Sequence, residues 1–147
     1  MSGITAEVRI DAPPSVVWAQ LADISSHTGW MADATAIRFT SDRREGTGTT
    51  FDCNTKVGPL RLVDRMQITA WEPERRMGVR HVGLVTGVGE FVLRPDAPAA
   101  THMTWNEELR FPWWLGGRAG AWVARPVLGQ IWRGNLRRLR DQVEGSD

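Results

Sequence analysis

Residues 4–10 alternate between apolar and polar side chains with a period of two, which predicts a strand with one face in solvent. The Pro13-Pro14 pair ends this strand, and Pro14 suits the first turn of a short helix that runs to Leu21. The segment 23–31, broken by serine and glycine, predicts a second short helical turn. The start of the chain therefore predicts one strand followed by two short helices.

The two-residue period returns between residues 34 and 111 and predicts six strands in succession. Their alternating positions cover residues 37–39, 51–57, 60–68, 77–82, 85–93 and 101–111. Glycine, proline and acidic residues separate them, as is typical of turns. Because no helix interrupts the series, we expect an antiparallel meander, and the first strand brings the sheet to seven strands.

From residue 113 to residue 143 the period becomes helical, and arginines fall largely off the apolar face. The residues that we assign to this face are Trp122, Leu128, Trp132, Leu136, Leu139 and Val143. Pro126 inside the segment predicts a kink or a division into two helices. The segment therefore predicts one long C-terminal helix.

The order of these elements excludes a doubly wound fold, because no helix alternates with the strands. We predict an α+β fold that forms a single domain over residues 1–147. A seven-stranded curved antiparallel sheet wraps around the long C-terminal helix, and two short helices follow the first strand. One helix cannot fill the concave side of seven bent strands, so this arrangement predicts an internal cavity.

Alternation also assigns side chains to the inner face of the sheet. In the last strand this face carries Met103, Trp105, Glu107, Leu109 and Phe111. A carboxylate among apolar residues has a raised pKa unless it is paired, so Glu107 is a candidate general acid or base, or an anchor for a ligand hydroxyl. The alternative is a position at the cavity mouth, solvated or paired with an arginine.

The same argument places Asp64 on the inner face of the fourth strand and His81 on that of the fifth. For Asp64 the alternative is a structural ion pair or a strand bulge. For His81, the one histidine that we place near the interior, the alternative is a hydrogen-bonded structural group. Glu107, Asp64 and His81 are thus the candidate catalytic residues.

Composition adds an unusual feature, eight tryptophans with no tyrosine and four phenylalanines. Tryptophan suits both a core and the wall of a pocket that holds flat or apolar molecules. The side chains that we predict to line the cavity are Trp30, Met31, Phe51, Met66, Phe91, Met103, Trp105 and Trp122. Cys53 is expected to face inward beside Phe51, where burial keeps its thiol neutral and unreactive.

Other classes of site find no support. The motifs GxSxG, HExxH and CxxC do not occur, and the three histidines lie on different elements, so we expect no metal and no cofactor. Gly87 and Gly89 do not form a dinucleotide-binding motif and are interpreted as strand glycines that allow bending or a close-lying ligand. A formal net charge of +1 gives no field to attract nucleic acid.

Location and assembly are constrained only coarsely. One cysteine excludes an internal disulfide, and the N-terminus has no signal-peptide pattern, so we expect a cytoplasmic protein. No apolar run approaches the length of a membrane span, so we expect no stable membrane insertion.

The aromatic segment 111–117 is interpreted as a hydrophobic staple, a cavity gate or a membrane contact. Monomer and homodimer both remain open.

Three stretches of the chain resemble a known family: "AEVRIDAPPSVVWAQLADISSHTGWM", "WEPERRMGVRH" and "THMTWNEELRF". They are similar to the START-like helix-grip (SRPBCC) superfamily, which includes the birch pollen allergen and polyketide cyclase/dehydrase-like proteins. The resemblance covers about residues 6–143. It implies a hydrophobic ligand cavity under the long helix, whereas its members range from lipid carriers and hormone receptors to aromatase/cyclases.

The leading hypothesis from sequence is therefore a binding or carrier domain for a small hydrophobic molecule of aromatic or polyketide-like character. A second hypothesis is a cofactor-free polyketide cyclase or dehydratase, in which Glu107, Asp64 or His81 moves protons. A third is a protein-interaction module that uses the surface around Trp113 and Trp114, which predicts a small or filled cavity.

Overall fold

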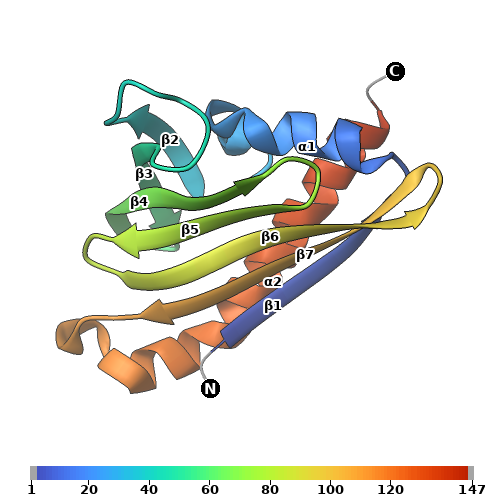
Figure 1. Ribbon diagram of the computed structural model, residues 1–147. Coiled ribbons are helices and arrows are strands. Elements are labelled where there is room, and N and C mark those ends of the chain that lie inside the picture. The colour runs from blue at the N-terminus through green and yellow to red at the C-terminus, as the bar shows by residue number, and fades with distance from the viewer. Residues whose placement is uncertain (1–2, 146–147) are drawn as a thin grey trace.

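The computed structural model describes residues 3–145, which form seven strands, two α-helices and two short 3₁₀ helices (Figure 1). The elements are β1 (Gly3–Ile10), α1 (Pro14–Ala22), η1 (Ile24–Gly29), β2 (Ala34–Phe39), β3 (Thr50–Val57), β4 (Leu60–Glu72), β5 (Arg76–Val82), β6 (Thr86–Ala97), β7 (Ala100–Arg110), η2 (Trp113–Leu115) and α2 (Gly117–Glu144). The predicted order of one strand, two short helices, six strands and a long helix is confirmed.

All seven strands join one antiparallel sheet in the order β1-β7-β6-β5-β4-β3-β2. Strands β2 to β7 therefore form a meander in chain order, and β1 lies at the edge of the sheet, paired with β7. Register shifts in β2, β4 and β6 each leave an extra residue on one strand, which bends the strand and increases its twist. The result is the curved sheet that crosses α2 in Figure 1.

Helix α2 packs against β1 and β7 and covers the concave side of the sheet. The buried residues of α2 include Leu128, Trp132, Leu136, Leu139 and Val143, as its helical period predicts. Of the two alternatives predicted at Pro126, a kink or a division into two helices, the division does not occur, because α2 is continuous from Gly117 to Glu144 with Pro126 inside it. Figure 1 shows the first turns of α2, in orange, running at an angle to the red remainder, so the helix bends instead.

Trp122 does not belong to the buried face of α2. Its side chain is 67% exposed, whereas its neighbour Ala121 is buried. Trp122 precedes Leu128 by six residues, a rotation of about 240° around the helix, whereas Ala121 precedes it by seven and returns to nearly the same direction. The expectation that Trp122 lines the cavity is therefore wrong. Trp122 was assigned to the apolar face because its side chain is large and apolar, although its angular position on the helix differs from that of the buried residues.

Candidate ligand cavity

A cavity of about 450 Å³ lies between the concave face of the sheet and α2. Apolar side chains from six strands and from α2 make up most of its wall. Trp105 and Trp132 stack with their ring centroids 4.9 Å apart, and Phe91 meets Trp105 edge to face at 5.1 Å. All three rings border the cavity, which gives it an aromatic floor suited to a flat apolar molecule.

Five of the eight side chains predicted to line the cavity border it in the structure. These are Met31, Phe51, Met66, Phe91 and Trp105. They come from the loop after η1 and from β3, β4, β6 and β7. Alternation placed the four strand residues correctly, because the face of a strand residue depends only on its parity within the strand.

Trp30 and Met103 are corrections, because both are buried in the core and neither borders the cavity. Trp30 packs behind the wall, with its ring against Phe91 at 5.9 Å and Trp105 at 6.2 Å. Met103 does face inward, as its parity predicts, but it lies one inward position before Trp105, where the core is filled. Parity reports the face of a strand residue, whereas the extent of a cavity depends on what packs opposite it.

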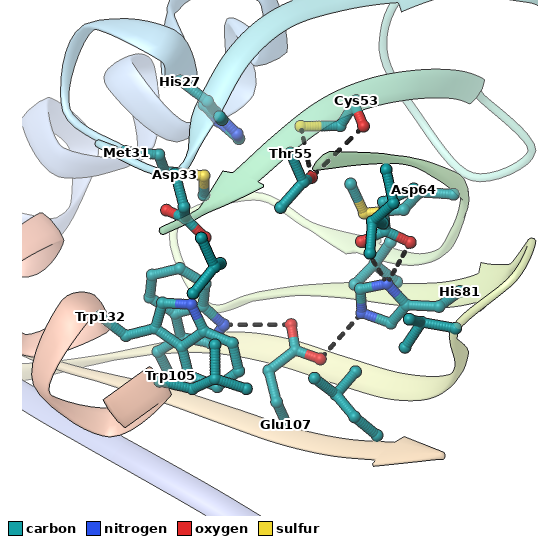
Figure 2. A pocket seen from close by; sticks show the side chains of 18 of the residues that line it. His27, Met31, Asp33, Cys53, Thr55, Asp64, His81, Trp105, Glu107 and Trp132 are labelled. Atoms are coloured by element: carbon teal, nitrogen blue, oxygen red, sulfur yellow. Dashed lines mark hydrogen bonds and ion pairs between the residues drawn. The ribbon is translucent and has the colours of Figure 1, made fainter. Parts of the chain in front are cut away.

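The candidate catalytic residues meet in one hydrogen-bonded group, the His81 cluster, made of Asp64, His81 and Glu107 (Figure 2). His81 Nδ1–H donates to the carboxylate of Asp64, with N···O distances of 3.0 and 2.9 Å. Its Nε2–H donates to Glu107 Oε2 at 2.9 Å, and Trp105 Nε1–H donates to Glu107 Oε1 at 3.1 Å. All three members of the cluster border the cavity.

These residues come from three different strands, and β6 lies between two of them. His81 on β5 is paired with Gly87 of β6, and Glu107 on β7 is paired with Gly89 of β6. Gly87 and Gly89 have the same parity as the inward residue Phe91, so no side chain rises between His81 and Glu107. A Cβ atom on Gly89 would meet the Glu107 carboxylate and one on Gly87 the Glu108 backbone, so both glycines allow close approach within the chain, while the expected bending or close-lying ligand stays a prediction.

His81 is held as an imidazolium. Burial by itself lowers the pKa of His81, but the hydrogen bonds to Asp64 and Glu107, together with the charges of both, outweigh this effect. The pKa rises from its ordinary 6.5 to about 10. Both ring nitrogens therefore donate, and the cluster of two carboxylates and one imidazolium keeps a net charge of −1.

His27 also borders the cavity, so the expectation that His81 is the one histidine near the interior is wrong. His27 Nε2–H donates to the backbone carbonyl of Leu21 at 2.8 Å. Burial is the largest influence and lowers the pKa of this imidazole to about 4, so His27 is neutral. No periodic signal could reveal it, because it lies on the 3₁₀ helix η1, whose position over the sheet is set by tertiary packing.

A second polar group, missed from the sequence, lies across the cavity from the His81 cluster (Figure 2). Asp33 borders the cavity, and the fully buried Asn135 of α2 donates its Nδ2–H to Asp33 Oδ1 at 2.8 Å. Asn135 Oδ1 in turn accepts from the backbone N–H of Ala32 at 2.9 Å. A buried asparagine within an apolar helix face was the available signal, because such a side chain requires partners.

Cys53 borders the cavity from β3 and is buried, as expected. Burial is the main cause that raises the pKa of its thiol from 9.0 to about 11. The thiol is therefore neutral near pH 7, as predicted.

Among the residues that the structure describes, no group of three or more His, Cys, Asp or Glu side chains is arranged to hold a metal ion.

One end of the cavity reaches the protein surface near η2. Leu60, Val85, Phe111 and Leu115 border the cavity there, and the Leu60 side chain is also exposed. Of the three aromatic residues in the segment 111–117, Phe111 packs against the core as a hydrophobic staple would, whereas Trp113 is 87% exposed and Trp114 is exposed as well. No helix within residues 3–145 has the length and apolar character needed to cross a membrane.

The geometry of a curved sheet, a long helix and an enclosed apolar cavity agrees with a sequence comparison. The profile of the family described as "Polyketide cyclase / dehydrase and lipid transport" matches residues 1–144. The chain belongs to this family. The START-like superfamily suggested by the sequence is thereby confirmed, and comparison with curated proteins yields no significant match.

Solved structures of the family fold superpose on nearly the whole chain. A START superfamily protein from Mycobacterium smegmatis is 10% identical, with a TM-score of 0.78 and 99% of each chain covered. The Zhui aromatase/cyclase from Streptomyces sp. R1128 is 18% identical, with a TM-score of 0.75 over 97% of this chain and 93% of that one. At these identities the likeness establishes the fold of this family member, and its ligand must be argued from the cavity.

Proposed function

We propose that this protein binds a small apolar molecule of aromatic or polyketide-like character in the cavity under α2. The observation that carries the proposal is the cavity of about 450 Å³, walled by apolar side chains with only a few polar groups. Burial of a ligand there is favourable by roughly 25 cal/mol for each Å² of apolar surface removed from water. Trp105, Trp132 and Phe91 offer ring faces and edges to a flat ligand.

The first experiment is native mass spectrometry of the freshly purified protein. A discrete adduct that is released on denaturation supports the proposal and reports the mass of the ligand. If no adduct is present, binding of the neutral fluorophore N-phenyl-1-naphthylamine tests the cavity directly. A protein that neither carries an adduct nor binds this probe contradicts the proposal.

Two matched alanine substitutions on α2 test whether the probe occupies this cavity. Ala124 borders the cavity, whereas Ala119 is exposed on the same helix. Ala124→Phe fills part of the space and is expected to weaken probe binding by about ten-fold or more, because the added ring competes for the same volume. Ala119→Phe adds the same ring in solvent and should leave binding unchanged. Equal binding by both variants would place the probe elsewhere.

A second candidate function is a cofactor-free cyclase or dehydratase, and the His81 cluster favours it. Three titratable side chains border the same cavity, so proton donors and acceptors converge on one bound molecule. Two features favour binding over catalysis. Both carboxylates are already occupied by donors, and an imidazolium with a pKa of about 10 gives up its proton reluctantly near pH 7.

Glu107→Gln separates the two candidates. In a cyclase, formation of rings from a soluble polyketone thioester should be abolished, because the amide cannot accept a proton, while binding of the probe persists. Glu108→Gln is the matched control, because Glu108 is the exposed neighbour on the outer face of β7. Absence of ring formation by the unmodified protein removes the catalytic candidate, and unchanged turnover in the Glu107 variant removes this residue as the proton carrier.

A further inference from the structure

Apart from the imidazolium of His81, the charged groups in the cavity wall are all carboxylates. Asp33, Asp64, Glu90 and Glu107 border the cavity, whereas among the described lining residues there is no lysine or arginine. Glu90 has the outward-facing parity of β6, and its carboxylate accepts from Arg76 Nε at 3.0 Å on that outer face, where Arg76 also pairs with Glu72. The interior charge therefore depends on Asp33 and the His81 cluster.

In neither of these two groups is the negative charge fully compensated by a cation. In the His81 cluster one imidazolium faces two carboxylates, which leaves a charge of −1. Asp33 accepts from the amide of Asn135, whose Oδ1 accepts in turn from Arg138 Nη2, and Asp33 itself belongs to no ion pair within the described part of the chain. Two negative charges thus face the cavity from opposite sides, as Figure 2 shows for Asp33 and His81.

We propose that the cavity selects neutral or cationic apolar molecules that carry a hydroxyl or ammonium donor, and that it discriminates against carboxylates of the same shape. This inference rests on the proposed binding function and names the ligand class. A ligand carboxylate would lose its hydration next to these carboxylates and find no lysine or arginine in the described wall, while the imidazolium of His81 already donates to Asp64 and Glu107. A hydroxyl or ammonium group can instead donate to Asp33 or to the His81 cluster.

Three probes with one ring system test this selectivity by isothermal titration calorimetry near pH 7. They are 2-naphthol, which is neutral, 2-(aminomethyl)naphthalene, which is a cation, and 2-naphthoate, which is an anion. We expect the neutral and cationic probes to bind at least about ten-fold more tightly than the anion. If naphthoate binds as tightly as naphthol, the charge selectivity is overturned and the binding function stands. If naphthol does not bind, the binding function itself fails.

Asp33→Asn identifies the source of the selectivity. It removes one of the two negative charges at constant shape, so the ratio of cation affinity to anion affinity should fall by about three-fold or more. Asp42→Asn is the matched control, because Asp42 is exposed and does not border the cavity. Circular dichroism confirms that each variant is folded. An unchanged ratio in the folded Asp33 variant overturns the role assigned to Asp33.

A different observation concerns the end of the molecule where the cavity reaches the surface, which we call the mouth end. It comprises residues 56–61, 82–86 and 110–127, each of which contributes side chains to the cavity border. The exposed apolar residues of the mouth end are Leu60, Val82, Leu84, Trp113, Trp114, Trp122, Val123 and Val127. In Figure 1 the β5–β6 turn and the orange η2 segment lie at the same side of the molecule.

The charges of the mouth end are all positive. These three segments contain no aspartate or glutamate. Their basic residues are Lys56, Arg61, Arg110, Arg118 and Arg125. On α2, Trp122 lies one turn from Arg118 and from Arg125, so an exposed ring stands between cationic side chains. Exposed tryptophan combined with arginine matches the headgroup region of an anionic bilayer.

We infer that the mouth end docks on the surface of an anionic membrane, so that the cavity opens toward the lipid. Co-sedimentation with vesicles of phosphatidylcholine, with and without phosphatidylglycerol, tests this inference. We expect binding to the anionic vesicles, lost at high salt and reduced about ten-fold or more when Trp113 and Trp114 are both replaced by serine. Val16→Ser, an exposed apolar position on α1, is the control and should leave binding unchanged.

Arg118→Gln distinguishes the electrostatic part, because it should weaken binding to anionic vesicles and leave the apolar residues in place. Binding to neither vesicle type overturns the membrane inference. Equal binding to neutral and anionic vesicles overturns the role of the basic residues. Neither result bears on the selectivity of the cavity, which is measured without lipid.

Discussion

The carboxylate of Glu107 lies directly over the backbone of Gly89. A Cβ atom placed on Gly89 would stand 2.3 Å from the carboxyl carbon of Glu107 and 2.3 Å from its Oε1. The two residues are cross-strand partners on β6 and β7. Because Glu107 accepts from both His81 and Trp105, the missing side chain at residue 89 is what allows this hydrogen-bonded arrangement to form.

Gly89→Ala should therefore displace Glu107 from its two donors. The Glu107 carboxylate is the end of a flexible side chain and can move, so the cost is the loss of its buried hydrogen bonds, about 1–3 kcal/mol of the free energy of unfolding. Urea denaturation measures this change. Gly3→Ala is the control, because a Cβ there meets no atom closer than 3.8 Å. Equal stability of the two variants would contradict the arrangement.

The imidazolium of His81 makes stability depend on pH on the alkaline side. Its pKa is about 10 in the folded chain and 6.5 as the ordinary value, so its contribution is complete below 6.5 and is lost as the pH rises toward 10. The free energy of unfolding should fall by at most about 1.4 kcal/mol per pH unit in this window. Urea titrations across the window measure the slope.

His81→Gln should flatten that alkaline slope, because the side chain that binds the proton is gone. His102→Gln is the matched control, since His102 is a partly exposed histidine on the outer face of β7. The chemical shift of the His81 ring in ¹⁵N NMR gives an independent readout. A ring that titrates near its ordinary pKa would show that the two carboxylates do not hold it as an imidazolium.

His27 produces the opposite dependence on the acid side. Its pKa is about 4 when folded and 6.5 as the ordinary value, so the unfolded chain binds a proton first. Stability should therefore fall as the pH drops from 6.5 toward 4. His27→Gln, whose amide can still donate to the carbonyl of Leu21, should weaken this acid dependence. If the wild-type and variant profiles coincide over this window, His27 is not buried in its neutral form.

Cys53 should resist alkylation in the folded protein. Its pKa of about 11, against an ordinary 9.0, lowers the thiolate fraction near pH 8 by about a hundred-fold. Iodoacetamide labelling followed by mass spectrometry should thus be at least that much slower in buffer than in urea. A ligand bound in the cavity should slow the reaction further, because Cys53 borders it. Equal rates in buffer and urea would contradict the burial of this thiol.

Local patterns in the sequence were sufficient to predict the secondary-structure elements and the inward faces of the strands. Alternation with a period of two is a local property, so it was enough to turn Asp64, His81 and Glu107 inward and to predict seven strands before one long helix. These inferences hold because each depends on residues adjacent in the chain.

Contacts between these side chains depend instead on how distant segments pair and pack. His81 reaches Glu107 because the register of three strands places both beside glycines of β6, and register depends on pairing between distant segments. His27 and Asp33 enter the cavity wall from segments whose position over the sheet no local period specifies. Trp122 was misassigned for a different reason, because its spacing from Leu128 already places it off the face of α2 that packs against the sheet.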